Sequence, residues 1–194
     1  MRERFGTIES LGESYNPSLG ARLIRRFSKA QLAENTDIPS LTEIESAFGH
    51  HAAVELLKIH VRDLFDYVEC EQGSDDNRIR EFSDLVLSRR YYLNIAEFIY
   101  FLSECKLARY GMFYGKTGTH QLARMLNDYL RARDTELERA ESERRSKEVD
   151  SLTNGYDEYM ASLIRRTADG DERAREVLMM HGKVFRENAN KQAK

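Results

Sequence analysis

The segment from Tyr91 to Leu130 is the most apolar part of a polar chain, and it constrains the fold more than any other segment. Asn94 and Glu97 have the spacing of a capping box, and Leu93 and Phe98 fit the hydrophobic staple across it, so a helix is predicted to begin here. Apolar residues then recur at helical spacing and extend to the other side of the same helix: Ile95, Phe98, Ile99, Tyr100, Phe101, Leu102 and Cys105. The pattern predicts a central helix packed on several sides, followed by an aromatic turn and a second helix.

Other helix boundaries lie on the N-terminal side of this segment. Asn16-Pro17 predicts a helix start, and Ser40 with Glu43 forms a second capping box after Pro39. Gly49 is expected to end that helix, because glycine readily adopts the left-handed conformation that closes one. Amphipathic patterns predict two more helices around residues 54–68 and 79–86. Since no stretch shows sustained strand alternation, we expect an all-α fold.

The C-terminal third differs sharply in composition. Past the apolar residues that end at Leu130, the helix becomes almost wholly charged, with Glu141 and Arg145 in the favourable i, i+4 order. Asn154-Gly155 predicts a break, and the turn at Asp169-Gly170-Asp171 then separates two short amphipathic helices. We therefore expect a multi-helix globule over residues 1–130, a long projecting charged helix over 131–153 and a C-terminal helical hairpin and tail over 154–194.

Composition limits the class of protein. The 194 residues carry a formal net charge of -3, unevenly spread: residues 1–30 total +3, residues 31–130 total -6, residues 149–164 hold three acids and no base, and residues 165–194 total +3. Any binding of nucleic acid must therefore come from a local patch. No apolar run has the length of a membrane span, and the two cysteines, Cys70 and Cys105, match no metal or redox spacing. We expect a cytoplasmic protein without membrane contact or cofactor.

A basic stripe is predicted near the N-terminus. Arg22, Arg25, Arg26 and Lys29 share one face of the helix expected after Pro17. Such a stripe either forms the solvated face of a core helix or contacts phosphates or a partner.

The strongest functional candidate is the turn between Cys105 and Asn127. This stretch contains no acid, although the hundred residues around it total -6. Aromatic rings beside cations are what single-stranded nucleic acids need, because the rings stack on bases and the cations meet phosphates. Aromatics in an interhelical turn also commonly close the end of a core, and a protein interface is a third possibility. The candidate residues are Lys106, Arg109, Tyr110, Phe113, Tyr114, Lys116 and Arg124.

Patterns for catalysis and metal binding are incomplete. Gly115-Lys116-Thr117 resembles the end of a P-loop, but Tyr110 stands where the first glycine is required and the preceding segment is predicted to be helical. His50, His51 and His60 lack an H-E-x-x-H pattern or a cysteine partner. No nucleophile and base lie close enough in sequence to suggest catalysis, so a protein without enzymatic activity, catalytic residues or a metal is expected.

Three segments, IPSLTEIESAFG, LKIHVRDLFDYV and YYLNIAEFIYFLSECKLARYGMFYG, followed by a charged helix, resemble small all-helical proteins encoded by phages and mobile elements of gut bacteria. The resemblance covers about Ile38 to Arg145 and implies a role in replication or regulation of the element, without implying any catalytic residue. A second segment, LIRRTADGDERAREVLMMHGKVF, is similar to the opening helices of bacterial sigma factors. A simpler account is that Gly170 ends one helix and Asp171 caps the next.

Two functional hypotheses follow. The first is an accessory protein of a phage or mobile element that binds single-stranded DNA or a replication protein through the basic aromatic turn, supported by the basic stripe. The second is a protein-binding or structural module whose contact surface is the charged helix and the hairpin. Salt-dependent affinity for single strands would favour the first, and salt-insensitive association would favour the second.

Overall fold

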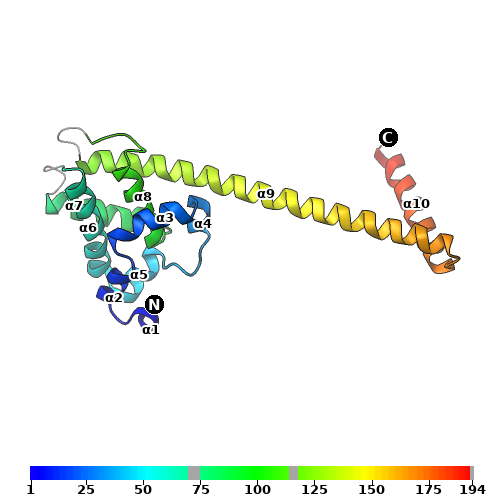
Figure 1. The fold of residues 1–194 in the computed structure, drawn as a ribbon, viewed down its shortest axis with the longest axis horizontal. Coiled ribbons are helices and arrows are strands. Elements are labelled where there is room, and N and C mark those ends of the chain that lie inside the picture. Colours follow the sequence, from blue (N-terminus) through cyan, green and yellow to red (C-terminus); the bar gives the residue numbers. More distant parts are fainter. Residues whose placement is uncertain (70–74, 114–117, 193–194) are drawn as a thin grey trace. The chain divides into compact units, whose positions relative to one another are not determined.

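The computed structural model describes residues 1–69, 75–113 and 118–192, with side chains described to residue 183. The chain is all-α, as predicted, and the described residues contain no β-strand (Figure 1). None of the helices in these ranges is both long enough and apolar enough to cross a membrane. The elements are α1 (Arg2–Phe5), α2 (Ile8–Ser14), the 3₁₀ helix η1 (Pro17–Leu19), α3 (Gly20–Arg26), α4 (Lys29–Ala33), α5 (Leu41–Phe48), α6 (His50–Tyr67), α7 (Asp76–Arg89), α8 (Ile95–Lys106), α9 (Gly118–Ala168) and α10 (Glu172–Gln192).

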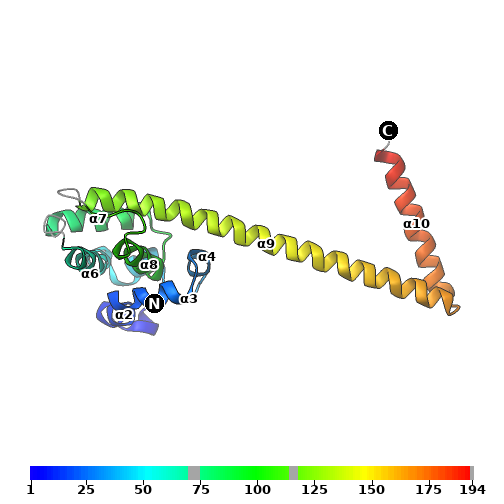
Figure 2. The ribbon, with the colours of Figure 1, turned by 45° about the horizontal axis from the view of Figure 1, so that its top comes forward.

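The chain divides into two compact units, Met1–Arg139 and Ala140–Lys194, and α9 contributes to both. The predicted break at Asn154-Gly155 is wrong, because α9 continues through it as one helix (Figure 2). Asn and Gly are poor helix formers, but each keeps its backbone N–H, so the hydrogen-bond ladder continues where a proline would interrupt it.

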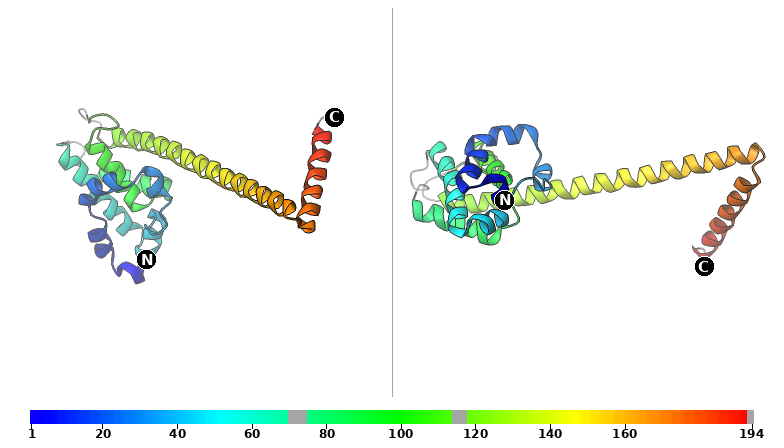
Figure 3. Two further views of the ribbon diagram at one scale, coloured as in Figure 1. Left: turned by 45° about the vertical axis from the view of Figure 1, so that its right-hand side comes forward. Right: turned by 90° about the horizontal axis from the view of Figure 1, so that it is seen from below.

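Helix α8 is the centre of the first unit, as the sequence predicts. Ten of its twelve residues are buried, since α3, α4 and α6 pack around it. Helices α6 and α7 lie side by side against each other (Figure 3). The first turns of α9 complete this core with Leu122, Met125, Leu126, Tyr129 and Leu130, all buried.

Both predicted capping boxes are present, and the structure brings them together. Ser40 caps α5 with Glu43, and Asn94 caps α8 with Glu97. Ser40 and Asn94 form an isolated antiparallel bridge, with the backbone N–H of Leu41 donating to the carbonyl oxygen of Leu93 at 2.8 Å. Two helix starts that are distant in sequence thus satisfy each other's free amides.

Candidate functional site

The basic aromatic turn folds back onto the core. After α8, the chain turns through Ala108 and Gly111, which have φ values of 55° and 100°. The hydroxyl of Tyr110 donates a hydrogen bond to the carboxylate of Glu104, and burial, reinforced by this carboxylate, raises the pKa of the phenol. The Tyr110 ring centroid lies 6.5 Å from that of Tyr129, edge to face. Tyr110 therefore closes one end of the core.

Phe113 also packs against the globule. Its ring meets Phe65 of α6 edge to face, with 5.8 Å between centroids. Of the roles that the sequence left open for these rings, the positions of Tyr110 and Phe113 favour closing the core over stacking on bases. Tyr114 and Lys116, together with the P-loop-like Gly115 and Thr117, lie outside the described residues.

Two cations of the turn are already paired with carboxylates. Lys106 binds Asp63, and its Nζ lies 5.1 Å from the centroid of the Tyr67 ring. Arg109 is 62% exposed, and its guanidinium lies 3.2 Å from the buried carboxylate of Glu104. Arg124 is exposed on α9. Two of the cations predicted for this turn are therefore already paired with acids of α6 and α8, whereas Arg124 stays exposed on α9.

The predicted basic stripe is wrong for Lys29, because residues 17–30 do not form one helix. Helix α3 ends at Arg26, and Ser28 starts α4 with a capping box to Gln31. Phe27 between them is extended, so the helical register that would align Lys29 with the arginines is lost. The Ser28-x-x-Gln31 pattern was a local signal for this second helix start.

Lys29 is instead buried where three helices, α4, α8 and α9, meet. It is 1% exposed, and its Nζ lies 3.0 Å from Glu104 of α8 and 3.3 Å from Glu136 of α9. Its backbone N–H also donates to the Glu136 carboxylate at 2.9 Å. The ammonium lies 5.5 Å from the centroid of the Tyr100 ring. Such a cation is unavailable to phosphate, and it fixes α4 against α8 and α9.

The remaining arginines of the stripe are accessible. Arg22, Arg25 and Arg26 are all exposed on α3. None of them forms an ion pair within the part of the chain that the structure describes. They remain a local patch of positive charge on the first unit.

The histidines considered as metal ligands lie apart. His50 links two helices, with Nδ1 2.6 Å from Glu45 and Nε2 2.7 Å from Asp84. These hydrogen bonds, chiefly the one to Glu45, raise the pKa of His50. His60 is buried on α6, and burial lowers its pKa to about 4. Within the described ranges, no group of three or more His, Cys, Asp or Glu residues is placed to hold a metal ion.

The second unit carries an exposed apolar stripe that the sequence predicts only in part. Val149, Leu152, Tyr156 and Tyr159 follow one another on α9 at intervals of three, four and three residues. Their side chains are between 46% and 70% exposed. This spacing is that of alternating a and d positions in a coiled coil. The expected break at Asn154-Gly155 hid the pattern, because it divided the stripe between two helices.

The core of the second unit is very small. Leu163, the next position of the stripe, and Ala174 of α10 are its buried apolar residues among those described. Tyr156 also meets His181 of α10, with ring centroids 6.3 Å apart. Asp171 caps α10, as predicted, by accepting from the N–H groups of Arg173 and Ala174. Most of the large apolar side chains described in this unit are therefore in contact with solvent.

Comparisons with known proteins identify no relative of this chain. No protein-family model matches the chain, and searches of curated proteins and of solved structures found no match. The resemblance to proteins of phages and mobile elements stays a prediction from sequence.

Proposed function

We propose that this protein is an interaction module that associates with a second copy of itself through the C-terminal unit. The observation that carries the proposal is the exposed stripe of Val149, Leu152, Tyr156 and Tyr159 at coiled-coil spacing. In water, such a stripe gains free energy when another helix covers it. The apolar association would pair two copies of the chain through their C-terminal units.

The distribution of charge favours a second copy of this chain as the partner that covers the stripe. Residues 149–164 hold three acids and no base, whereas residues 165–194 total +3. When two hairpins pair with α9 of one copy against α10 of the other, the acidic segment of each meets the basic segment of its partner. Two hairpins brought together would form a four-helix arrangement that buries both stripes.

The test measures molar mass by light scattering after size exclusion, over a range of protein concentrations and at two salt concentrations. We expect the mass to approach that of a dimer as concentration rises, and to persist at high salt, because apolar burial is not screened. Leu152→Glu should give a monomer. Asn154→Glu adds the same charge about 200° around the helix and should leave the dimer intact. Weak association between proteins is normally visible at about 0.2 mM. A wild-type chain that stays monomeric at this concentration would refute the proposal.

Nucleic-acid binding is a second candidate, supported by the exposed patch of Arg22, Arg25 and Arg26 and not by base stacking at the turn. Fluorescence anisotropy of a labelled single-stranded DNA at low and moderate salt tests it. Replacing the three arginines with glutamine should weaken binding and flatten its salt dependence. Arg78→Gln, at an exposed arginine near Asp75, is the control. Absence of binding at low salt would leave a protein, such as the replication protein expected from the resemblance, as the external partner.

A further inference from the structure

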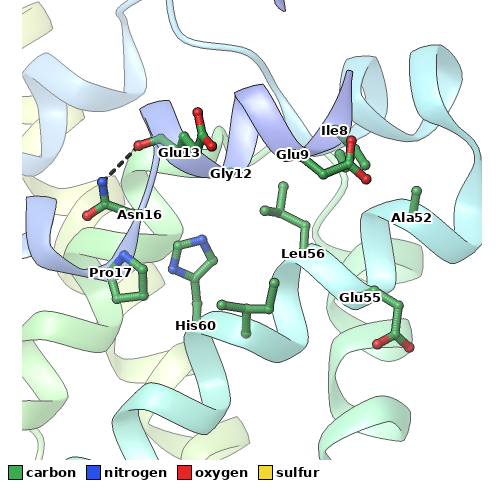
Figure 4. A pocket seen from close by; sticks show the side chains of 11 residues that line it. Ile8, Glu9, Gly12, Glu13, Asn16, Pro17, Ala52, Glu55, Leu56 and His60 are labelled. Carbon is green, nitrogen blue, oxygen red and sulfur yellow. Dashed lines mark hydrogen bonds between the residues drawn. The ribbon is translucent and has the colours of Figure 1, made fainter. Parts of the chain in front are cut away.

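An apolar groove lies between α2 and α6 in the first unit, away from the basic turn. It encloses about 600 Å³, which lies within the roughly 300–1,000 Å³ typical of small-molecule sites. Figure 4 shows Leu56 and His60 rising from α6 toward α2, with Pro17 beside the imidazole. Ile59, also on α6, lines the groove and is 58% exposed.

Gly12 keeps the groove open on the α2 side. A Cβ atom at this position would lie 3.5 Å from Cδ1 of Leu56, which is ordinary van der Waals contact. A single methyl group would therefore fit, whereas a longer side chain would extend into the space between the helices. The absence of a side chain at residue 12 thus shapes the cavity.

His60 places a polar atom at the floor of this apolar space. The residue is 2% exposed, and its Nε2 has no hydrogen-bond partner among the described residues. Burying a polar atom without a hydrogen-bond partner costs free energy, and a hydrogen bond to that atom recovers much of this cost. A ligand whose hydroxyl or other polar group reached Nε2, through a small shift of the side chains that cover this atom, would recover this loss.

The rim of the groove is acidic. Glu9, Glu13 and Glu55 line it, and no Lys or Arg does. Glu55 already accepts a hydrogen bond from Lys58 at 3.0 Å. Glu9 and Glu13 lie four residues apart on α2, and neither has an ion pair within the described ranges. Hydrogen bonds from its own backbone N–H and from Thr7 hold the pKa of Glu9 below its ordinary value, so this carboxylate is ionised. A cation beside these carboxylates would gain an ion pair that neither of them has in the described chain.

We propose that this groove binds a small apolar molecule that carries a protonated amine. Its apolar body would lie on Leu56 and Ile59, its ammonium group beside Glu9 and Glu13, and a polar group would meet His60. The inference goes beyond the proposed function, because the groove belongs to the first unit and self-association to the second.

Three chemically matched probes test the proposal by isothermal titration calorimetry with the full chain: 8-amino-1-octanol, 1-octylamine and 8-hydroxyoctanoate. We expect the amino alcohol to bind most tightly. Loss of the hydroxyl should weaken binding about fivefold, the effect of one hydrogen bond. Replacing the ammonium with a carboxylate should weaken it about tenfold or more, because the rim then repels the ligand.

Variants separate this site from nonspecific apolar binding. Gly12→Leu fills the groove and should reduce binding of 8-amino-1-octanol below detection. Gly155→Leu makes the same substitution at a helical glycine with no heavy atom within 4 Å, and it should bind as the wild type does. His60→Leu should remove the preference for the amino alcohol over octylamine. Circular dichroism confirms that each variant is folded before titration.

Several results would overturn the proposal that this groove binds an amine. Equal affinity for all three probes, or undiminished binding by Gly12→Leu, would show that no built site recognises an amine. Absence of binding at about 1 mM of each probe would also overturn the proposal, because even a ligand with few atoms is expected to be detected there. The monomeric variant Leu152→Glu should bind the probes normally, so failure of self-association and failure of the groove are distinguishable.

Discussion

Burial of His60 makes the stability of the first unit depend on pH in a way that one substitution can remove. Desolvation lowers the pKa of this imidazole from 6.5 to about 4, while Asp63 opposes the shift and Lys106 adds to it. The folded protein therefore holds His60 neutral at pH values where the unfolded chain would already bind a proton. Its contribution to stability is present above pH 6.5 and is lost as pH falls toward 4.

The magnitude follows from the difference between the two pKa values. At roughly 1.4 kcal/mol for each pH unit, the full loss is about 3 kcal/mol, and about 2 kcal/mol of it is reached by about pH 5. We expect His60→Leu, which cannot titrate, to lack this part of the pH dependence. Carboxylates elsewhere titrate in both proteins, so their effects cancel in the difference between wild type and variant.

The assay is urea denaturation followed by circular dichroism, at several pH values between about 7 and 5. The free energy of unfolding of the wild type, relative to that of His60→Leu, should fall by about 2 kcal/mol over this range. His51→Leu, at an exposed histidine on the same helix, should behave as the wild type does. Parallel pH profiles for wild type and His60→Leu would refute the argument that burial keeps this histidine neutral.

Three further substitutions test the packing of the chain. Gly20→Ala should destabilise the first unit by about 2 kcal/mol in urea denaturation, because overpacking has this cost and the new Cβ would lie 1.7 Å from a serine hydroxyl of α8. Gly155→Ala should gain about 1 kcal/mol in local helix stability, seen as slower amide hydrogen exchange around residue 155, and unchanged exchange would contradict the continuous α9. Lys29→Met should cost about 3 kcal/mol, because the buried carboxylate of Glu104 would keep the Tyr110 hydroxyl as a donor but only the exposed Arg109 as a cation, and a loss below about 1 kcal/mol would show that the buried pair is dispensable.

Local signals in the sequence predicted the helix boundaries well. The capping boxes at Ser40 and Asn94 need only residues three positions apart, so they are visible in sequence and present in the structure. The same signal at Ser28 starts a second helix, so Lys29 does not continue the basic stripe of α3 as predicted. At Asn154-Gly155, residue preference alone predicted a break that the continuing hydrogen-bond ladder of α9 overrides.

The candidate sites were less accessible to sequence reasoning. Tyr110 could have stacked on a base or closed the core, and the choice depends on Glu104 and on Tyr129 of another helix. The stripe on α9 was readable as a spacing, but its exposure was not. The groove beside Gly12 requires α2 and α6 to be neighbours, although more than forty residues separate Gly12 from Leu56.

The sequence by itself determined that this chain is all-α and that α8 is its central helix, because helical periodicity and capping depend on neighbours within one or two turns. It also determined that acidic and basic segments alternate along the chain. Only the tertiary structure decided which cations are available. Lys29 and Arg26 are three residues apart, yet one is buried between Glu104 and Glu136 and the other is exposed. The reason is physical: burial and ion pairing are set by residues distant in sequence, and no local pattern records which of these will meet.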